Sequence, residues 1–274
     1  MSMHLTLSNQ ELLDQELVEQ WRHQEAPLLA VLHAFHDRDG YLSESALRAI
    51  AKGLRQPLAD LFGTVTFYHH FAREEEGLRQ PRVCTGPVCS LRGADKLIAS
   101  LPAATAMPCA GRCDEPIPVL IGHEQWIGDE TGKLTRHATP LPPVNPGGSE
   151  ECIFAFIRQP GRNTLTGYRA TGGYEGLTRA VTQMTPTAVV EHIRQSRLAG
   201  RGGAGFPTGL KWKAVADAVG SPKTVVCNAD EGEPGCFKDR AILDYDPFAV
   251  IEGMTLAAYA TGATRGFLYL RYEY

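Results

Sequence analysis

Four cysteines in two close pairs are the residues of this chain most able to do chemistry. Their spacings are Cys84-x4-Cys89 and Cys109-x3-Cys113. Four thiolates can hold a [2Fe–2S] or [4Fe–4S] cluster, or a structural zinc ion. Plant-type ferredoxins need a further cysteine three residues after the second, where this chain has Arg92. Structural zinc usually binds C-x2-C loops. The spacing therefore favours an iron–sulfur cluster, with zinc and unliganded packing cysteines as the alternatives.

A glycine-rich segment at residues 200–205 is the second candidate. It reads GRGGAG and formally matches G-x-G-x-x-G. A predicted helix precedes it, whereas an ordinary Rossmann fingerprint follows a strand. Consecutive glycines still allow backbone N–H groups to form a nest for an anion. Arg201 and Lys211 add positive charge, and Phe206 offers a stacking face. The segment therefore suits a phosphate or a flat ring, and a plain turn between helices is the alternative.

An acidic segment is the third candidate. Residues 228–240 read NADEGEPGCFKDR and follow a predicted strand at 224–227. Proteins of the α/β class bind ligands at the carboxyl ends of strands. Asp230, Glu231 and Glu233 repel one another in a desolvated site unless they bind ligand donors or pair with nearby cations. The segment is therefore a candidate ligand loop, and a solvated acidic loop is the alternative.

The first half of the chain, which contains the four cysteines, divides into three segments. Residues 1–75 carry apolar residues at helical spacing and predict a helical bundle. Residues 76–136 predict a strand, a helix, a further strand and a β-hairpin, which together make a small α/β unit. Residues 137–149 (HATPLPPVNPGGS) contain four prolines and two glycines and predict a linker.

The second half, residues 150–274, alternates helices and strands. Thr185 and Pro186 predict the start of one helix. Further helices are predicted at 211–219 and 247–261, and strands at 224–227 and 266–272. The glycine-rich and acidic segments would then be loops of one α/β domain.

Composition limits the possible functions. The chain has 27 Lys and Arg against 31 Asp and Glu, a net charge of −4, which gives no footprint for nucleic-acid binding. Hydrophobic residues make up 43%, as in a globular protein, and no apolar run is long enough to span a membrane. The odd count of seven cysteines argues against a disulfide framework. The N-terminus is acidic and has no signal peptide. We therefore expect a cytoplasmic protein without membrane insertion.

Residues 27–136 resemble the thioredoxin-like [2Fe–2S] subunit of NADH:quinone oxidoreductase, the 24-kDa-type subunit of complex I. The resemblance is carried by residues 29–41 (LAVLHAFHDRDGY), by residues 63–71 (GTVTFYHHF) and by the cysteine spacing. It implies a helical bundle at 1–75 and a thioredoxin-like ferredoxin domain at 76–136. It also implies a [2Fe–2S] cluster, with these ligands: Cys84, Cys89, Cys109 and Cys113.

Residues 171–274 resemble the FMN- and NADH-binding 51-kDa-type subunit of the same enzyme, from GGYE at 172–175 to LRYEY at 270–274. Carried over by motif, the FMN contacts would be Gly202, Gly203, Lys211, Asn228, Asp230 and Glu231. Arg201 would support the phosphate region. Phe206 and Glu233 would lie on the NADH side, with Phe206 stacking on adenine. The resemblance implies no catalytic side chain, because the cofactors do the chemistry.

Together the two resemblances predict an α+β and α/β fold and an NADH dehydrogenase (diaphorase) module. Such a module passes electrons between NAD(H), FMN and iron–sulfur clusters. The fused order is similar to NAD-dependent formate dehydrogenases and NAD-reducing hydrogenases, so we expect other subunits of a multisubunit oxidoreductase as partners. The family's flavoprotein continues past residue 274, so we expect a fragment with an incomplete flavin pocket in 150–274. The alternatives are a [2Fe–2S] electron-transfer or docking protein with an inactive flavin half, and a zinc-stapled scaffold.

Overall fold

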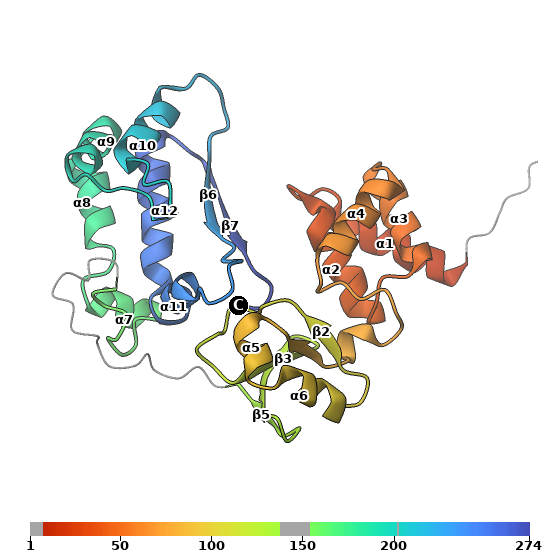
Figure 1. The fold of residues 1–274 in the computed structure, drawn as a ribbon. Coiled ribbons are helices and arrows are strands. Elements are labelled where there is room, and N and C mark those ends of the chain that lie inside the picture. The colour runs from red at the N-terminus through yellow and green to blue at the C-terminus, as the bar shows by residue number, and fades with distance from the viewer. Residues whose placement is uncertain (1–7, 138–153, 202) are drawn as a thin grey trace, which may run out of the picture. The chain divides into compact units, whose positions relative to one another are not determined.

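The computed structural model describes residues 8–137, 154–201 and 203–274, which form two compact units that divide after His137 (Figure 1). The linker predicted at 137–149 lies, apart from His137, outside these residues. Within the described ranges, no helix has the length and apolar character that crossing a membrane requires.

The first unit begins with four helices, as the apolar spacing predicts. They are α1 (Asn9–Trp21), α2 (Pro27–Asp39), α3 (Glu44–Leu54) and α4 (Leu58–Phe67). Helix α2 ends at Gly40, whose φ of +79° few other residues adopt easily. The Ser43 side chain then accepts a hydrogen bond from the Ala46 N–H at 3.1 Å and so caps α3.

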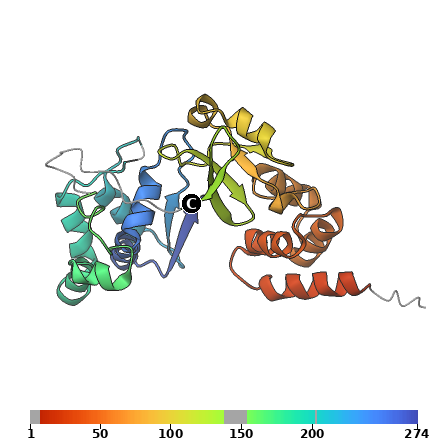
Figure 2. The same ribbon diagram turned by 90° about the horizontal axis from the view of Figure 1, so that it is seen from below.

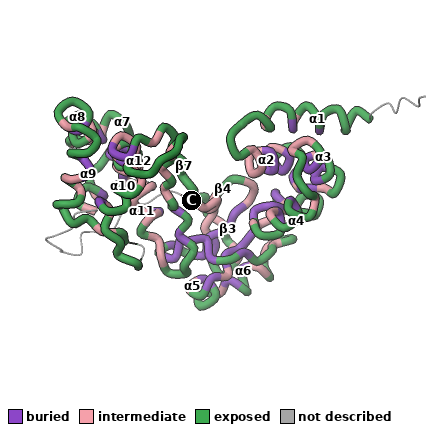
Figure 3. The backbone as a smooth tube through the Cα atoms, turned by 90° about the horizontal axis from the view of Figure 1, so that it is seen from above, coloured by how far each residue is buried: buried purple, intermediate pink, exposed green. Residues whose placement is uncertain are grey.

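The bundle core is made of large apolar side chains from α2, α3 and α4. Leu32, Phe35, Ile50 and Leu61 are 0% exposed, and Figure 3 shows the buried positions of α2 and α3. The run TVTFY at 64–68 has a strand-like composition, yet it belongs to the end of α4 and the residue after it. Val65 enters the core one helical turn after Leu61, so packing overrides local propensity.

The rest of the first unit is a five-stranded sheet with short helices. Its elements are η1 (Gly77–Arg79), β1 (Arg82–Cys84), α5 (Pro87–Leu91), α6 (Ala94–Ser100), β2 (Thr105–Met107), β3 (Ile117–Ile121), β4 (Glu124–Gly128) and β5 (Leu134–Arg136). The strand order is β2-β1-β3-β4-β5, with β1 and β2 parallel and the other neighbours antiparallel. The predicted helix, strand and hairpin are confirmed, and β2 is an addition.

A group of imidazoles packs where the bundle meets the sheet. His70 lies 5.1 Å from His33, 4.8 Å from His36 and 5.8 Å from His123, measured between ring centroids. His36 accepts a hydrogen bond from the Ala72 N–H at its Nε2 atom. Its ring is therefore neutral and carries its proton on Nδ1. Burial lowers the pKa of His36 to about 4 and lowers that of His70 as well.

The second unit consists of helices around a two-stranded parallel sheet. Its elements are α7 (Leu165–Ala170), α8 (Glu175–Gln183), α9 (Pro186–Gln195), α10 (Thr208–Asp217), β6 (Thr224–Ala229), α11 (Lys238–Tyr245), α12 (Pro247–Thr261) and β7 (Arg265–Leu270). Helix α12 lies along β6 and β7, as Figures 1 and 2 show. The helices and strands predicted in this half are confirmed within a few residues of their ends.

A buried carboxylate ties α12 to α8. Glu252 accepts hydrogen bonds from the Tyr168 hydroxyl at 2.5 Å, the Tyr174 N–H at 2.8 Å and the Leu177 N–H at 2.9 Å. The two amides belong to the first turn of α8, where N–H groups have no partner within the helix. A carboxylate at this position also interacts favourably with the helix dipole. Glu252 therefore caps α8 from a distant part of the chain.

We expect the first unit to lose stability as the pH falls from about 6.5 to about 4. An unfolded chain protonates His36 at an ordinary pKa of 6.5, whereas the folded unit keeps the ring neutral down to about pH 4. The unfolded state therefore binds more protons in this window. The free energy of unfolding should fall by about 1.4 kcal/mol per pH unit for each such histidine. Thermal unfolding across this pH range measures the slope.

The matched variants are His36→Gln and His69→Gln. His36→Gln should reduce the slope, because the side chain no longer titrates. His69 is exposed, so His69→Gln should leave the slope as it is. If the slope were equal in both variants, the loss of stability at low pH could not be assigned to the buried imidazoles.

Candidate functional site

The sheet and its first loop bring the four cysteines of the predicted cluster site together. Cys84 ends β1, Cys89 lies in α5, and Cys109 and Cys113 lie in the loop after β2. All four are buried. Because β1 and β2 are parallel neighbours, the loops that leave their carboxyl ends meet at one edge of the sheet. The sheet thus joins pairs that lie 20 or more residues apart.

The cysteine sulfurs contact one another as two adjoining pairs. The Sγ atoms of Cys109 and Cys113 are 3.5 Å apart. The Ala110 N–H, which follows Cys109, donates to Cys84 Sγ at 3.4 Å, and the Cys89 thiol lowers the pKa of Cys84. Two thiolates on one tetrahedral metal at about 2.3 Å lie about 3.8 Å apart, so these contacts suit two ligands for each metal atom. Among the described residues, no three His, Cys, Asp or Glu side chains are arranged to hold a single ion.

Hydrogen bonds prepare one sulfur to carry negative charge. The Cys89 thiol, followed by backbone N–H groups that include that of Ala110 at 3.4 Å, lowers the pKa of Cys84 to about 6. The same hydrogen bond raises the pKa of Cys89, because Cys89 is the donor. Burial raises the pKa of Cys109. The site therefore stabilises a first thiolate without a metal, whereas further thiolates need a cation to offset their charge.

The glycine-rich loop is closed by backbone hydrogen bonds at its base. The Gly200 N–H donates to the Phe206 carbonyl at 2.9 Å, and the Thr208 N–H donates to the Leu198 carbonyl at 2.8 Å. Gly203 has a φ of +95°, and a Cβ added there would meet nothing within 4 Å. Its backbone is therefore open to a ligand. Gly202 lies outside the described residues.

The cationic and aromatic residues of this region are only partly gathered. Phe206 and Lys211 line one pocket of about 680 Å³ with the end of α10 and the turn before β6. Arg201 is exposed and donates to the carbonyl of Ala199 at 2.6 Å. The pocket contains none of the acidic-segment residues 228–233. Thr224, the first residue of β6, lines it instead, whereas the acidic loop follows the other end of that strand.

The acidic loop has both outward and inward carboxylates. The Asn228 side chain accepts a hydrogen bond from the Asp230 N–H at 3.1 Å, which turns the chain as β6 ends. Asp230 and Glu233 are exposed. Glu231 is only 3% exposed and points into the protein. Sequence reasoning placed the three carboxylates together, but the structure separates Glu231 from the other two.

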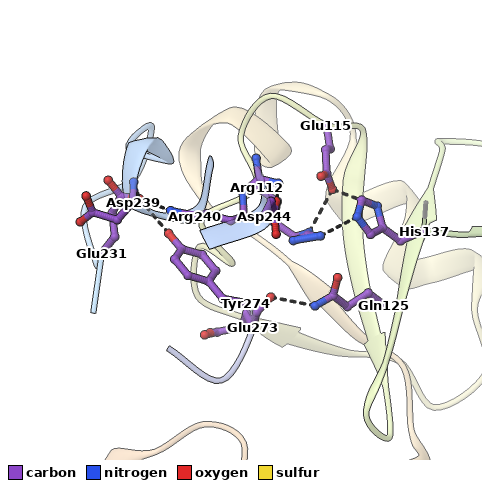
Figure 4. Close-up of polar contacts among 10 residues, drawn as sticks. All are labelled: Arg112, Glu115, Gln125, His137, Glu231, Asp239, Arg240, Asp244, Glu273 and Tyr274. Atoms are coloured by element: carbon purple, nitrogen blue, oxygen red, sulfur yellow. Dashed lines mark hydrogen bonds and ion pairs between the residues drawn. The ribbon is translucent and has the colours of Figure 1, made fainter. Parts of the chain in front are cut away.

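Glu231 is the centre of a hydrogen-bond network, part of which Figure 4 shows. Its carboxylate accepts from Lys238 Nζ at 3.0 Å, from the Asp239 N–H at 3.0 Å and from the Tyr274 hydroxyl at 3.0 Å. Arg271 donates to its backbone carbonyl at 2.6 Å. Burial alone would raise the pKa of Glu231, but these hydrogen bonds lower it on balance. Glu231 therefore fastens the loop to α11 and to the residues after β7.

Charged residues that sequence analysis did not single out hold the loop of the second cysteine pair. Arg112 pairs with Glu115, Nε to Oε2, at 3.1 Å, and its Nη2 lies 2.6 Å from His137 Nε2 (Figure 4). Arg112 and Glu115 are 4% and 5% exposed. Their spacing of three was visible in the sequence, but their burial and the contact with His137, 25 residues away, were not.

We expect Gly86→Ala to damage the cysteine site. A Cβ at position 86 would lie 2.8 Å from Cys109 Cβ and 3.2 Å from its sulfur, so the two cysteine loops would have to separate. Such overpacking costs about 1–3 kcal/mol. The metal content of the purified protein and its thermal unfolding measure the effect. The control is Gly63→Ala in α4, where a Cβ meets nothing within 4 Å. An unchanged metal content in Gly86→Ala would contradict this reading.

We expect Glu231→Ala to destabilise the second unit by about 2–4 kcal/mol, because it leaves several part-buried donors without their acceptor. The Asp239 N–H and the Tyr274 hydroxyl are among them. Glu233→Ala, at an exposed position of the same loop, should change stability by less than about 0.5 kcal/mol. Urea unfolding of both variants provides the comparison, and equal losses would show that Glu231 is not the anchor.

Two family models match the chain. One, described as thioredoxin-like [2Fe-2S] ferredoxin, matches residues 14–133, and the other, described as Nuo51 FMN-binding domain, matches residues 193–274. The predicted fold class is thereby confirmed.

The chain is similar to curated proteins over part or nearly all of its length. Over 125 residues, which are 46% of this chain and 30% of the relative, the chain is 52% identical to an F-type NADH-quinone oxidoreductase subunit of Rhizobium meliloti. It is 30% identical over 94% of its length to the NAD-reducing hydrogenase HoxS subunit alpha of Cupriavidus necator, of which it covers 48%.

A solved structure extends the likeness to the fold. The crystal structure of an NAD+-reducing [NiFe]-hydrogenase in the H2-reduced state aligns with 90% of this chain and 46% of that chain, at 25% identity and a TM-score of 0.66. The chain thus spans half or less of the length of these relatives. It combines a thioredoxin-like [2Fe-2S] ferredoxin domain with a Nuo51 FMN-binding domain, and its homologues are NADH-quinone oxidoreductase F subunits and the alpha subunit of an NAD-reducing hydrogenase.

Proposed function

We propose that the chain is an electron-transfer module of a larger oxidoreductase, which moves electrons between NAD(H), FMN and iron–sulfur clusters. The observation that carries the proposal is the set of four buried cysteines whose sulfurs adjoin in two pairs. A [2Fe–2S] cluster takes two thiolates at each iron. We assign Cys84 and Cys89 to one iron, and Cys109 and Cys113 to the other.

The second unit supplies the flavin and nucleotide contacts of the proposal. Four residues would contact FMN directly: Gly203, Lys211, Asn228 and Asp230; Gly202, outside the described residues, would join them. Arg201 would support the phosphate region, and Phe206 and Glu233 would lie on the NADH side. The open backbone at Gly203 and the outward carboxylates of Asp230 and Glu233 support these roles. Glu231 would act from inside, by holding the loop in place.

In this proposal the cofactors supply the redox chemistry and the protein binds and positions them. When bound, FMN would supply hydride transfer with NAD(H), and the cluster would supply single-electron transfer. The protein binds and orients the two groups, and we assign no side chain as a proton donor or acceptor. The partners would be further subunits of the oxidoreductase, like those of the hydrogenase and quinone oxidoreductase relatives. The location would be the cytoplasm, where cysteine pairs of this kind hold metals rather than disulfides.

A second function is favoured by one observation. The pocket of Phe206 and Lys211 does not include the acidic loop, so the two halves of the proposed flavin site are not gathered in it. The chain would then be a [2Fe–2S] electron-transfer or docking protein whose second unit binds no flavin.

The visible absorption spectrum of the purified full chain, recorded before and after NADH, separates the two functions. A cluster spectrum with a flavin component that bleaches with NADH supports the module. A cluster spectrum without flavin, inert to NADH but bleached by dithionite, supports the electron-transfer protein. A colourless protein, or one with one zinc and no iron, contradicts both.

Single substitutions test the assigned residues. Cys84→Ser or Cys113→Ser should reduce the iron content by at least half, because each removes a ligand, whereas Cys227→Ser, outside the cluster site, should retain it. Lys211→Met should lower the FMN content of the purified protein, because a cation is lost from the pocket. Lys213→Met removes an exposed cation of the same helix that pairs with Asp217, and it should retain FMN. Equal flavin contents in the two lysine variants would remove Lys211 from the site.

A further inference from the structure

A buried network of three side chains joins the loop of the second cysteine pair to the residue that follows β5. Arg112 precedes Cys113 directly and pairs with Glu115 at 3.1 Å. His137 follows β5 and closes the network, with its Nε2 2.6 Å from Arg112 Nη2 and its Nδ1 3.5 Å from Glu115 Oε2 (Figure 4). The side chains of all three are less than a tenth exposed. Burying two charges is costly, and pairing offsets that cost only in part. The presence of Arg112 and Glu115 here therefore needs an explanation beyond the stability of the fold.

The chemistry of arginine fixes the state of the histidine. A guanidinium has only donors, so His137 Nε2 must accept the hydrogen bond from Arg112. The ring is then neutral and carries its proton on Nδ1, the atom that faces Glu115. The network therefore contains one cation, one anion and one neutral ring that orients the cation. His137 is a positioning residue for Arg112.

The network also joins the two cysteine loops. The Glu115 N–H donates to the Arg112 carbonyl at 3.1 Å, which forms a turn around Cys113. The Glu115 carbonyl accepts from Arg92, which follows the short helix that carries Cys89. The charged pair is thus held in a fixed place relative to both loops.

A buried charge next to an iron–sulfur site changes how easily the site accepts an electron. A cluster held by four thiolates is negative and becomes more negative on reduction. A nearby cation therefore favours the reduced form, and a nearby anion favours the oxidised form. Burial strengthens both effects, because water does not screen them.

We propose that Arg112 and Glu115 are opposed charges that together set the reduction potential of the cluster, and that His137 holds Arg112 in place. This inference rests on the proposed [2Fe–2S] cluster at Cys84, Cys89, Cys109 and Cys113. Because the two charges oppose each other, removing either one shifts the potential, and the shifts have opposite signs. A network that only stabilised the fold would give no such pair of shifts.

Redox titration of the full chain, followed by the cluster absorption, tests the proposal. Arg112→Gln leaves the anion of Glu115 and should lower the midpoint potential. Glu115→Gln leaves the cation of Arg112 and should raise it. Arg112→Lys keeps the charge and should restore a potential near that of the wild type. The titrations are made at about pH 9, where an imidazole released from Arg112 stays neutral and does not replace the lost charge.

The control is an exposed ion pair of the same sheet. Arg136 and Glu124 pair at 2.7 Å, with side chains 70% and 48% exposed. Arg136→Gln and Glu124→Gln should leave the potential unchanged, because solvent screens both charges. If shifts of the same sign occurred in Arg112→Gln and Glu115→Gln, or none at all, the proposal would be overturned.

Two other results can be told apart from a refutation of this proposal: a variant that fails to fold, and a wild-type chain that holds no cluster. If Arg112→Gln does not assemble a cluster, Glu115→Gln alone decides, and a potential that is unchanged or lower contradicts the proposal. A wild-type chain without a cluster spectrum would instead refute the proposed function, before any variant is compared.

Discussion

The first unit depends on a contact between two cysteine loops that are distant in the sequence. Cys84 and the loop of Cys109 come together because β1 and β2 run parallel and end at the same edge of the sheet, where the Ala110 N–H donates to Cys84 Sγ at 3.4 Å. The close approach needs Gly86, since any larger residue would push against Cys109. The next turn, which the Glu115 N–H and the Arg112 carbonyl close around Cys113, carries the buried pair of Arg112 and Glu115. The sheet order, the glycine and the buried ion pair are thus parts of one constraint.

In the second unit, hydrogen bonds and one ion pair hold the acidic loop in place. The structure divides its carboxylates into buried and exposed ones. Glu231 and Glu252 are buried and satisfied by backbone and hydroxyl donors. Asp230 and Glu233 remain exposed on the loop that Glu231 fastens. Negative charge directed inward holds the loop, so that charge directed outward is available to a ligand.

Local patterns in the sequence were sufficient for most elements and for the four cysteines. The cap at Thr185, and the alternation of helix and strand after it, depend on residues a few positions apart. The features that escaped prediction depend on distant partners. Strand β2 has only three residues and exists because it pairs with β1. The inward turn of Glu231 depends on Tyr274, 43 residues later, and the Arg112 network depends on His137. No window of sequence contains both partners of such contacts.

The cap of α8 by Glu252 has a consequence for how the chain folds during synthesis. Leu177 and the carboxylate that accepts its N–H are 75 residues apart. At about 5–20 residues per second, the ribosome makes Glu252 about 4–15 seconds after Leu177. During that interval the first turn of α8 has water as its partner, and a short helix without its packing is marginal. The second unit therefore completes this helix only when α12 has emerged.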